Sequence, residues 1–593
     1  MKPLALLGAL ALASLAPTLA QDTANTAPYA FPTNPLASWP SVAENEAAAA
    51  GVLARRGYGG KGKGHGGKGH GHGHGHGGKC KPRPETPVNT TGYRYYHECT
   101  KDFLTAPLPD VNWDLGEMYS GNIPIDPGNP NNTLFFVFKP RDGPPVDELT
   151  IWLNGGPGCS SLFGFVREIG PMMWAAGQAR PRPNPYSWAN LTNVLFVDQP
   201  VGTGFSTGTP TARSAAEVAT QFADWFGQFS KTFGIRNYKI FVTGESYGGQ
   251  WVSYITSEFF ARSATDKSTY DVRGNLVYSG VVGDYPVQHD DIPALPFIEG
   301  RRRYFGFTDE KMDALRAKAA RCGWTEYYDK YMAFPPAGVQ PQLEFRQDCS
   351  MFPNTWSTAL KVNPCDDPNG INHLCPAPDD LVFGIFGRMF VPSETLGYTL
   401  YFERPDVVKA LNAPTSKRFT MCVRDALIGT GRPGGYPDDS PPAIQAALPQ
   451  SIDGTGRVLL VGGDLDFNMA PEGILLALQN TTWGGQLGFQ SRPNSTFYVH
   501  MLERAYQHIV SPSYPPNFVT GGQGPMGTWG QERGLAWVHQ DGAGHAVPEG
   551  QGRAAVMHLE WLLGHRQGFG FNDTTAYTDG DTFGVQFDFE YEP

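Results

Sequence analysis

Short apolar runs rich in β-branched and aromatic residues recur along the chain, at positions 238–243, 277–282, 457–461 and 536–539. Runs of this length, bounded by glycine or polar residues, are typical of buried parallel strands. The first run is followed, from 249 to 260, by a helical pattern that contains no proline and no turn cluster. This order predicts an α/β protein with a central, mostly parallel sheet flanked by helices.

The junction between that first run and its helix carries a serine flanked by glycines, in the order Gly-Glu-Ser-Tyr-Gly at residues 244–248. Glycines two positions before and two after the serine let the backbone turn sharply and lift the serine Oγ above the sheet edge. A glycine-rich surface turn gives the same five letters, but without a strand before it and a helix after it. The flanks therefore predict the nucleophile elbow of an α/β-hydrolase fold, with Ser246 as the nucleophile.

Residues suited to activate a serine follow two of the later predicted strands. Asp464 and Asp466 come after the third run, and His545 lies in a glycine loop after the fourth. Taken singly, an aspartate after a glycine pair is most often a turn or cap residue, and a loop histidine is most often solvated. The order serine, acid, histidine is nevertheless the order of the triad in this fold. We therefore predict a triad of Ser246, one of the two aspartates and His545.

Short blocks along the chain follow the order of one known family. They are WLNGGPGCSS at 152–161, EIGP at 168–171, NPYSW at 184–188, DQPVGTGFS at 198–206, GESY at 244–247 and GH at 544–545. With them the chain resembles the serine carboxypeptidases of the α/β-hydrolase fold, from about residue 93 to residue 566. The resemblance implies hydrolysis of the C-terminal peptide bond of peptides and proteins that have a free C-terminus, without a metal or an organic cofactor.

Carried over by position, the resemblance assigns a role to each residue of the predicted centre. It implies that Ser246 is the nucleophile, that His545 is the general base and then the acid, and that Asp466, the second of the two aspartates, orients the histidine. It further implies an oxyanion hole made by the backbone N–H groups of Gly156 and Tyr247. One such donor follows the nucleophile and the other lies in an early glycine loop, as this chemistry requires.

A carboxypeptidase must also recognise the free carboxylate of its substrate. The resemblance implies that Asn154, Glu168 and Glu245 do so. Two glutamates bind a carboxylate only if a proton is retained, and a carboxyl group crowded by another has a raised pKa and keeps its proton. We therefore expect activity to be favoured at acid pH and to be lost as those protons leave.

The hydrolase pattern is interrupted after the run at 277–282. Three consecutive arginines, four cysteines and proline-rich loops precede its return near residue 401. We predict an inserted lid subdomain at about 286–400 within a serine carboxypeptidase domain that covers 88–593.

The composition of the first 87 residues predicts segments for targeting and proteolytic processing instead of a folded domain. Residues 1–20 combine a lysine, an apolar stretch too short to span a membrane and small residues near Ala20, which is typical of a secretory signal peptide. Residues 21–87 lack hydrophobic periodicity and contain alternating histidines among glycine and lysine, so we predict a disordered segment and a possible propeptide. Loose metal binding is the alternative for these histidines. The expected location is extracellular, with a vacuolar compartment as the second choice.

The charge and the cysteines agree with secretion. A net charge of −11 over 593 residues disfavours nucleic acid and anionic membranes as partners. Eight cysteines behind a signal peptide predict disulfides, and the resemblance implies that Cys159 pairs with Cys422. The oligomeric state stays open. Asn-X-Ser/Thr sequons predict N-glycosylation at Asn89, Asn131, Asn190, Asn480, Asn494 and Asn572.

Two other functions remain open on the same fold. An acyltransferase or esterase uses the same triad, and the presence of Asn154, Glu168 and Glu245 argues against it. A catalytically silent relative is the second alternative, and the complete set of triad residues argues against that one.

Overall fold

The computed structural model describes residues 92–384, 397–500 and 521–573. The predicted signal peptide (1–20), the predicted disordered segment and propeptide (21–87), Cys80 and the sequon at Asn89 lie outside these residues. Within the described ranges, no helix has the length and apolar character needed to cross a bilayer.

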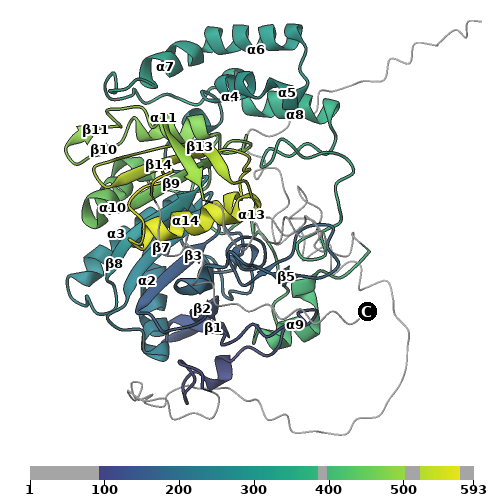
Figure 1. Ribbon diagram of the computed structural model, residues 1–593, viewed down its shortest axis with the longest axis vertical. Helices are drawn as coiled ribbons and strands as arrows, with labels where there is room; N and C mark the ends of the chain where they lie inside the picture. Colours follow the sequence, from purple (N-terminus) through teal and green to yellow (C-terminus); the bar gives the residue numbers. More distant parts are fainter. Residues whose placement is uncertain (1–91, 385–396, 501–520, 574–593) are drawn as a thin grey trace, which may run out of the picture.

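A ten-stranded sheet in the described part of the chain organises the molecule, in the order β1-β2-β6-β3-β7-β8-β9-β14-β13-β12 (Figure 1). The strands from β6 to β14 in this order are parallel, and both edges are antiparallel. The strands are β1 (Tyr119–Asp126), β2 (Asn129–Lys139), β3 (Glu148–Leu153), β6 (Asn193–Asp198), β7 (Lys239–Glu245), β8 (Val272–Tyr278), β9 (Val458–Gly463), β12 (Ser495–Val499), β13 (Gly524–Glu532) and β14 (Leu535–Gln540).

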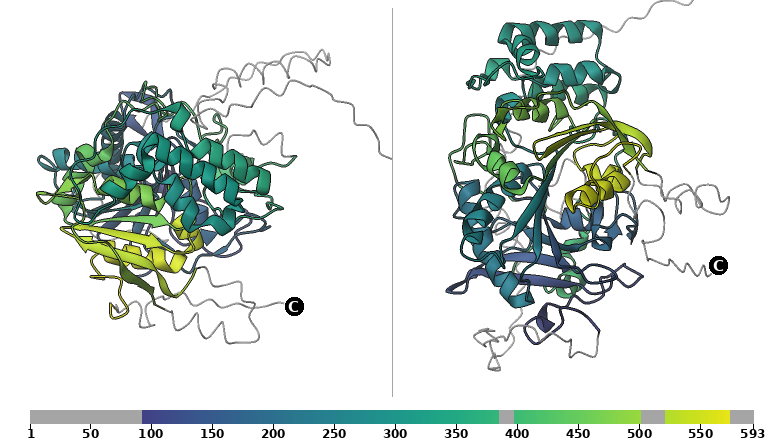
Figure 2. Two further views of the ribbon diagram at one scale, coloured as in Figure 1. Left: turned by 90° about the horizontal axis from the view of Figure 1, so that it is seen from above. Right: turned by 60° about the vertical axis from the view of Figure 1, so that its left-hand side comes forward.

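Helices cover both faces of this sheet (Figure 2). Both faces of the sheet are apolar, as alternate residues of β2 illustrate. Phe136 and Phe138 belong to one apolar cluster, and Phe135 and Val137 belong to another. Since successive side chains of a strand point to opposite faces, each face has its own core. The first cluster includes α2 (Ala215–Phe233), α3 (Gly248–Ser263) and α10 (Ala447–Thr455), and the second includes α14 (Gly552–Leu562).

The predicted strands at 238–243, 457–461 and 536–539 correspond to β7, β9 and β14. The prediction at 277–282 is wrong in its bounds, because β8 begins at Val272 and ends at Tyr278. Ser279 has a φ of 47°, a left-handed conformation that ends the strand. After the strand, Val281 N–H donates to the Ser246 carbonyl, so this part of the run lies beside Ser246 instead of in the sheet.

The segment between β8 and β9 carries a group of helices that lies at the top of Figure 1. They are α4 (Ala294–Gly300), α5 (Arg302–Phe305), α6 (Asp309–Cys322), α7 (Trp324–Tyr331) and α8 (Phe352–Val362). A third apolar cluster packs this segment against residues that follow β9, namely Leu465, Phe467, Ala470 and Leu476. The Cys322–Cys349 disulfide joins α6 to the chain that precedes α8.

Shorter elements connect these parts. The helices are η1 (Lys101–Phe103), η2 (Gly164–Glu168), η3 (Trp188–Asn190), η4 (Tyr285–His289), η5 (Gln347–Cys349), η7 (Tyr401–Glu403), α9 (Pro405–Ala410), η8 (Ala443–Gln445), α11 (Pro471–Leu478) and α13 (Val547–Gly550). The two-residue strands are β4 (Met172–Met173), β5 (Arg182–Pro183), β10 (Thr482–Trp483) and β11 (Gln486–Leu487).

Candidate active site

Ser246 stands at the turn between β7 and α3. Its φ of 61° is left-handed, which is costly for a residue with a side chain and needs support from its surroundings. The support is a set of backbone hydrogen bonds: Ser246 N–H donates to the Tyr278 carbonyl over 2.9 Å, and the Ser246 carbonyl accepts from Gly249 N–H at 2.9 Å and Val281 N–H at 2.8 Å. The strand, the strained serine and the helix are the features of a nucleophile elbow.

The glycine loop after β3 runs directly against this elbow. A Cβ placed on Gly155 would lie 2.5 Å from Tyr247 N and 2.6 Å from Ser246 Cβ, so only glycine allows this approach. Gly156 follows with a φ of 113°, again a conformation that favours glycine. The sequence pointed to Gly156 and Tyr247. Sequence analysis missed Gly155, which precedes Gly156 in the same Gly-Gly pair. Its close approach to Tyr247 and Ser246 shows why a side chain does not fit there.

The glycine loop is anchored on its far side. The buried carboxylate of Asp198, at the end of β6, accepts from Ser160 Oγ at 2.6 Å and from Ser161 N–H at 2.9 Å. Cys159 and Cys422 form a disulfide beside it. These contacts hold the loop that carries the predicted oxyanion donor.

His545 and Asp466 meet in the loops that follow β14 and β9. The His545 Nδ1 lies 2.8 Å from Asp466 Oδ2, and the second oxygen of Asp466 accepts from Met469 N–H at 2.8 Å. Asp466 is fully buried. Burial disfavours a charged imidazole, but the carboxylates of Asp466, Asp367 and Glu168 outweigh it, so the pKa of His545 is raised above its ordinary value.

Asp464 lies elsewhere, although only one residue separates it from Asp466. Its carboxylate binds the Arg301 guanidinium at 2.8 Å and lies 3.2 Å from His539 Nε2. Asp464, His539 and Asp541 bring their ligand atoms close enough to suit a metal ion. However, the Arg301 guanidinium also lies 3.5 Å from His539 Nε2, and its positive charge disfavours a cation there.

The three residues predicted to bind a substrate carboxylate lie together next to Ser246. Asn154 Nδ2 donates to Glu168 Oε1 at 3.2 Å and to Glu245 Oε1 at 3.4 Å. The orientation of the Asn154 amide is fixed, because its oxygen accepts from Trp152 Nε1 at 2.8 Å and from Gly164 N–H at 3.1 Å. The amide nitrogen must therefore face the two carboxyl groups.

The two glutamates are almost completely buried, with exposed fractions of 1% for Glu168 and 5% for Glu245. Burial raises the pKa of Glu168, and burial together with the neighbouring charge of Glu168 raises the pKa of Glu245 well above its usual range. The cause is the cost of holding two negative charges side by side away from water. The pair therefore retains a proton at pH values where an exposed glutamate has lost it.

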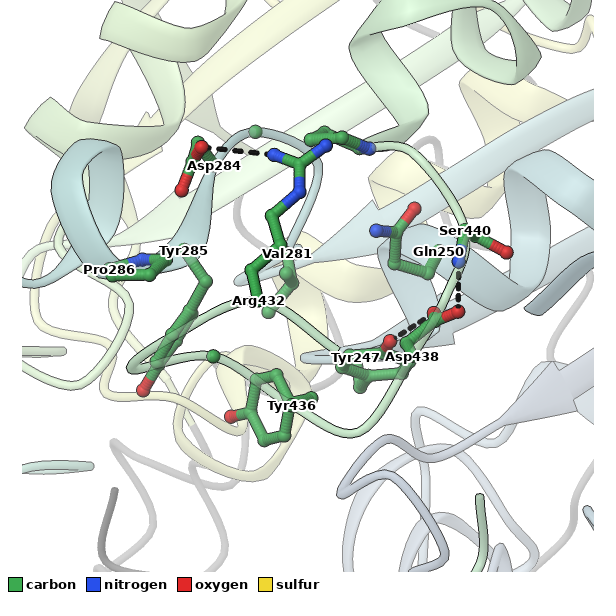
Figure 3. Close-up of a pocket in the computed structure, with 13 residues that line it drawn as sticks. Tyr247, Gln250, Val281, Asp284, Tyr285, Pro286, Arg432, Tyr436, Asp438 and Ser440 are labelled. Atoms are coloured by element: carbon green, nitrogen blue, oxygen red, sulfur yellow. Dashed lines mark hydrogen bonds and ion pairs between the residues drawn. The ribbon is translucent and has the colours of Figure 1, made fainter. Parts of the chain in front are cut away.

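The side chain of Tyr247, whose backbone is the second predicted oxyanion donor, is also anchored (Figure 3). Its hydroxyl donates to Asp438, and the other oxygen of Asp438 accepts from Ser440 N–H at 2.8 Å. On its other side the Tyr247 ring packs against Tyr436, with ring centroids 4.8 Å apart. Sequence analysis missed Asp438, which stands in a proline-rich loop without any recognisable pattern.

The predicted glycosylation sites differ in exposure. Asn131, Asn494 and Asn572 are exposed, whereas Asn190 and Asn480 are half-buried. The Asn480 side chain accepts from Gln340 N–H at 2.8 Å, and the Asn190 amide donates to the Pro185 carbonyl at 3.2 Å. The three exposed asparagines therefore present the more accessible amides.

The sheet order, the elbow and the two loops that follow β9 and β14 define an α/β-hydrolase. The sequence profile described as serine carboxypeptidase matches residues 109–565. Serine-type carboxypeptidase F of Aspergillus niger is 41% identical over 479 residues, which cover 80% of this chain and 89% of that protein. The chain belongs to the serine carboxypeptidase family, and serine-type carboxypeptidase is its enzyme class.

Two further comparisons agree. A probable serine carboxypeptidase of Arthroderma benhamiae is 35% identical over 77% of this chain and 85% of its own length. The crystal structure of Kex1(delta)p, a prohormone-processing carboxypeptidase from Saccharomyces cerevisiae, matches with a TM-score of 0.58 and 21% identity, covering 79% of this chain and 96% of that one. This structural likeness supports the shared fold.

Proposed function

We propose that the protein removes single residues from the C-termini of peptides, with Ser246 as the nucleophile. The observation that carries this proposal is the Asn154, Glu168 and Glu245 site. Glu245 immediately precedes Ser246, so a substrate carboxylate bound there lies one residue away from the carbonyl that the serine attacks. An endopeptidase or a lipase has no use for such a site.

In the proposed reaction Ser246 Oγ attacks the last peptide carbonyl while His545 Nε2 takes its proton. The backbone N–H groups of Gly156 and Tyr247 donate to the oxygen that becomes negative, and Asp466 stabilises the imidazolium. His545 then protonates the nitrogen of the departing amino acid as the C–N bond breaks. Water releases the acyl group by the same steps in reverse.

The carboxylate site is tested with an N-blocked dipeptide and its C-terminally amidated analogue. We expect amidation to lower kcat/KM by about 10- to 100-fold, because a hydrogen bond to a charged group contributes about 1.5–3 kcal/mol. Equal rates for the two substrates would contradict the proposal. No release from either, with Ser246 still labelled by a fluorophosphonate, would favour acyl transfer or ester hydrolysis.

The pH dependence follows from the raised pKa values of the two glutamates. A shared proton lets one of them donate to the substrate carboxylate, so that proton must stay bound. As the pH rises through the pKa of the pair, the proton leaves and KM for peptides with a free carboxylate increases. We expect this alkaline limb to be absent when Glu168→Gln and Glu245→Gln are combined, and its persistence in that variant would place the titrating group elsewhere.

His545 sets the lower pH limit of activity, because its imidazole must be neutral to accept a proton. Its raised pKa works against catalysis at low pH, so activity should fall again when the imidazole is protonated. Activity is therefore expected in a pH range bounded below by the raised pKa of His545 and above by the pKa of the glutamate pair, so His545 opposes the acid preference that the glutamates alone would give.

We further propose that the protein is secreted. The disulfides Cys159–Cys422, Cys322–Cys349 and Cys365–Cys375 support an oxidising compartment. N-terminal sequencing of the protein recovered from culture medium tests this proposal and locates the processing site. Retention of the first 20 residues on an intracellular protein would contradict it.

A further inference from the structure

A loop of the inserted segment, at residues 365–375, touches both loops that carry the acid and the base. The Asn369 carbonyl accepts from His545 N–H at 2.7 Å. The Pro368 carbonyl accepts from Phe467 N–H at 2.8 Å and from Asn468 N–H at 2.9 Å. Pro368 and Asn369 are consecutive, so a single segment bonds both the loop that carries His545 and the loop that carries Asp466.

Further contacts fix the conformation of the 365–375 loop. Asp367 Oδ1 accepts from the backbone N–H of Asn369 at 2.9 Å and from its side-chain amide at 3.1 Å. The Asn369 side-chain oxygen in turn accepts from Asn468 Nδ2 at 3.0 Å. One turn later, Ile371 N–H donates to the Leu465 carbonyl at 3.1 Å.

The approach between the loop and the histidine segment is close. A Cβ placed on Gly544, immediately before His545, would lie 2.2 Å from the Asn369 carbonyl oxygen. Backbone therefore packs on backbone here, and a shift of the 365–375 loop must move either His545 or the loop itself out of contact.

A disulfide closes the loop at its base. Cys365 and Cys375 are bonded, ten residues apart. Asn363 precedes the ring, and its side-chain amide donates to the carbonyl of His373, which lies within the ring, at 2.7 Å. The Cys322–Cys349 disulfide of the inserted segment joins α6 to η5, and both of its cysteines belong to the apolar cluster that also contains Ile371.

The loop also brings a buried carboxylate near His545, because Asp367 accepts from Asn369 N–H and the Asn369 carbonyl accepts from His545 N–H. Among the carboxylates that raise the pKa of His545, Asp466 is followed by Asp367 and then Glu168. Asp367 is almost buried and lies 3.4 Å from His373 Nδ1. The other charged groups around Asp367 are Asp366 and Glu549.

We propose that the disulfide-closed 365–375 loop is a positioning element that holds the His545 and Asp466 loops in register, and that Asp367 is a second carboxylate supporting the charged form of His545. The inserted segment then contributes to catalysis itself as well as to the shape of the substrate cleft. This inference rests on the triad of the proposed function.

The positioning role is tested by removing one disulfide at a time from the full-length enzyme. We expect Cys365→Ser with Cys375→Ser to lower kcat by about 10- to 100-fold with KM little changed, since a misplacement of about 1 Å costs about 100-fold. The matched control, Cys322→Ser with Cys349→Ser, should lower Tm and keep kcat. Unchanged kcat in the first variant, or equal losses in both, would overturn the positioning role.

The electrostatic role has a separate readout that a loss of folding does not mimic. Asp367→Asn keeps an oxygen for Asn369 but removes the negative charge, which lowers the pKa of His545. The acid limb of the kcat/KM profile should therefore move to lower pH, whereas Asp366→Asn, in the adjacent residue, should leave it in place. An unmoved limb in Asp367→Asn, or equal shifts in both variants, would overturn this role.

The wild-type enzyme separates failure of this inference from failure of the proposed function. If the triad is wrong, the wild type neither releases the C-terminal residue nor reacts with a fluorophosphonate at Ser246. If only the 365–375 loop assignment is wrong, the wild type does both, and the Cys365/Cys375 and Asp367 variants behave like their controls.

Discussion

Replacing Asp466 by asparagine is expected to lower kcat by about 10⁴-fold, because the histidine then loses its charged partner and adopts the wrong tautomer. Asp466 Oδ2 lies 2.8 Å from His545 Nδ1, so the substitution changes the charge and the hydrogen bonding but hardly the volume. The measurement is kcat for release of the last residue from an N-blocked dipeptide. KM should change much less, since Asp466 contacts no part of the substrate in the proposed reaction.

The matched control is Asp464→Asn. Asp464 binds Arg301 at 2.8 Å, so its loss should lower Tm while kcat stays within about threefold of the wild type. This pair of variants separates two aspartates that lie two positions apart. A large loss of kcat in Asp464→Asn, with Asp466→Asn still active, would reverse the assignment.

Gly155→Ala is expected to lower kcat by about 10²- to 10³-fold, the usual cost of losing one oxyanion donor. The added methyl group would lie 2.5 Å from Tyr247 N, a backbone atom that cannot move aside without displacing Ser246. The carbonyl oxygen of the substrate would then lose a correctly placed N–H group. The effect is measured as kcat for peptide release, together with the rate of fluorophosphonate labelling, which depends on the same hole.

Gly300→Ala is the control for this substitution. Gly300 ends α4, and a Cβ there meets nothing within 4 Å. Wild-type kcat is therefore expected. If Gly155→Ala is as active as Gly300→Ala, the glycine loop after β3 does not supply the oxyanion hole.

The fold could be predicted from the sequence, and the catalytic residues proposed from it, because the signals of both are local. A buried strand, the Gly-Glu-Ser-Tyr-Gly turn and a following helix are consecutive at 239–263, and they predicted the fold class, which the comparisons confirm. The choice between Asp464 and Asp466 was different, since both follow the same strand. Residue patterns left it open and the family resemblance chose Asp466. The structure shows the physical difference: Asp464 binds the Arg301 guanidinium and lies beside His539, whereas Asp466 bonds His545.

The contacts of the inserted segment could not be predicted in this way. Asn369 and Pro368 bond the catalytic loops through their backbone carbonyls. Every residue has a backbone carbonyl, so residue type does not predict such a bond. Asp438 bonds a tyrosine almost 200 positions earlier, so no local pattern connects the two. Long-range hydrogen bonds of this kind become visible only when the chain is folded.

The place of β14 in the sheet also determines when, during synthesis, the proposed triad can assemble. β14 inserts between β9 and β13, and the loop after it brings His545 to a serine that was synthesised about 300 residues earlier. At roughly 5–20 residues per second, translation takes about 15–60 s to travel from one to the other. During that interval the nascent chain has its nucleophile but no base. With the proposed triad, peptide hydrolysis thus becomes possible only after the segment that carries His545 has been synthesised and has joined the sheet.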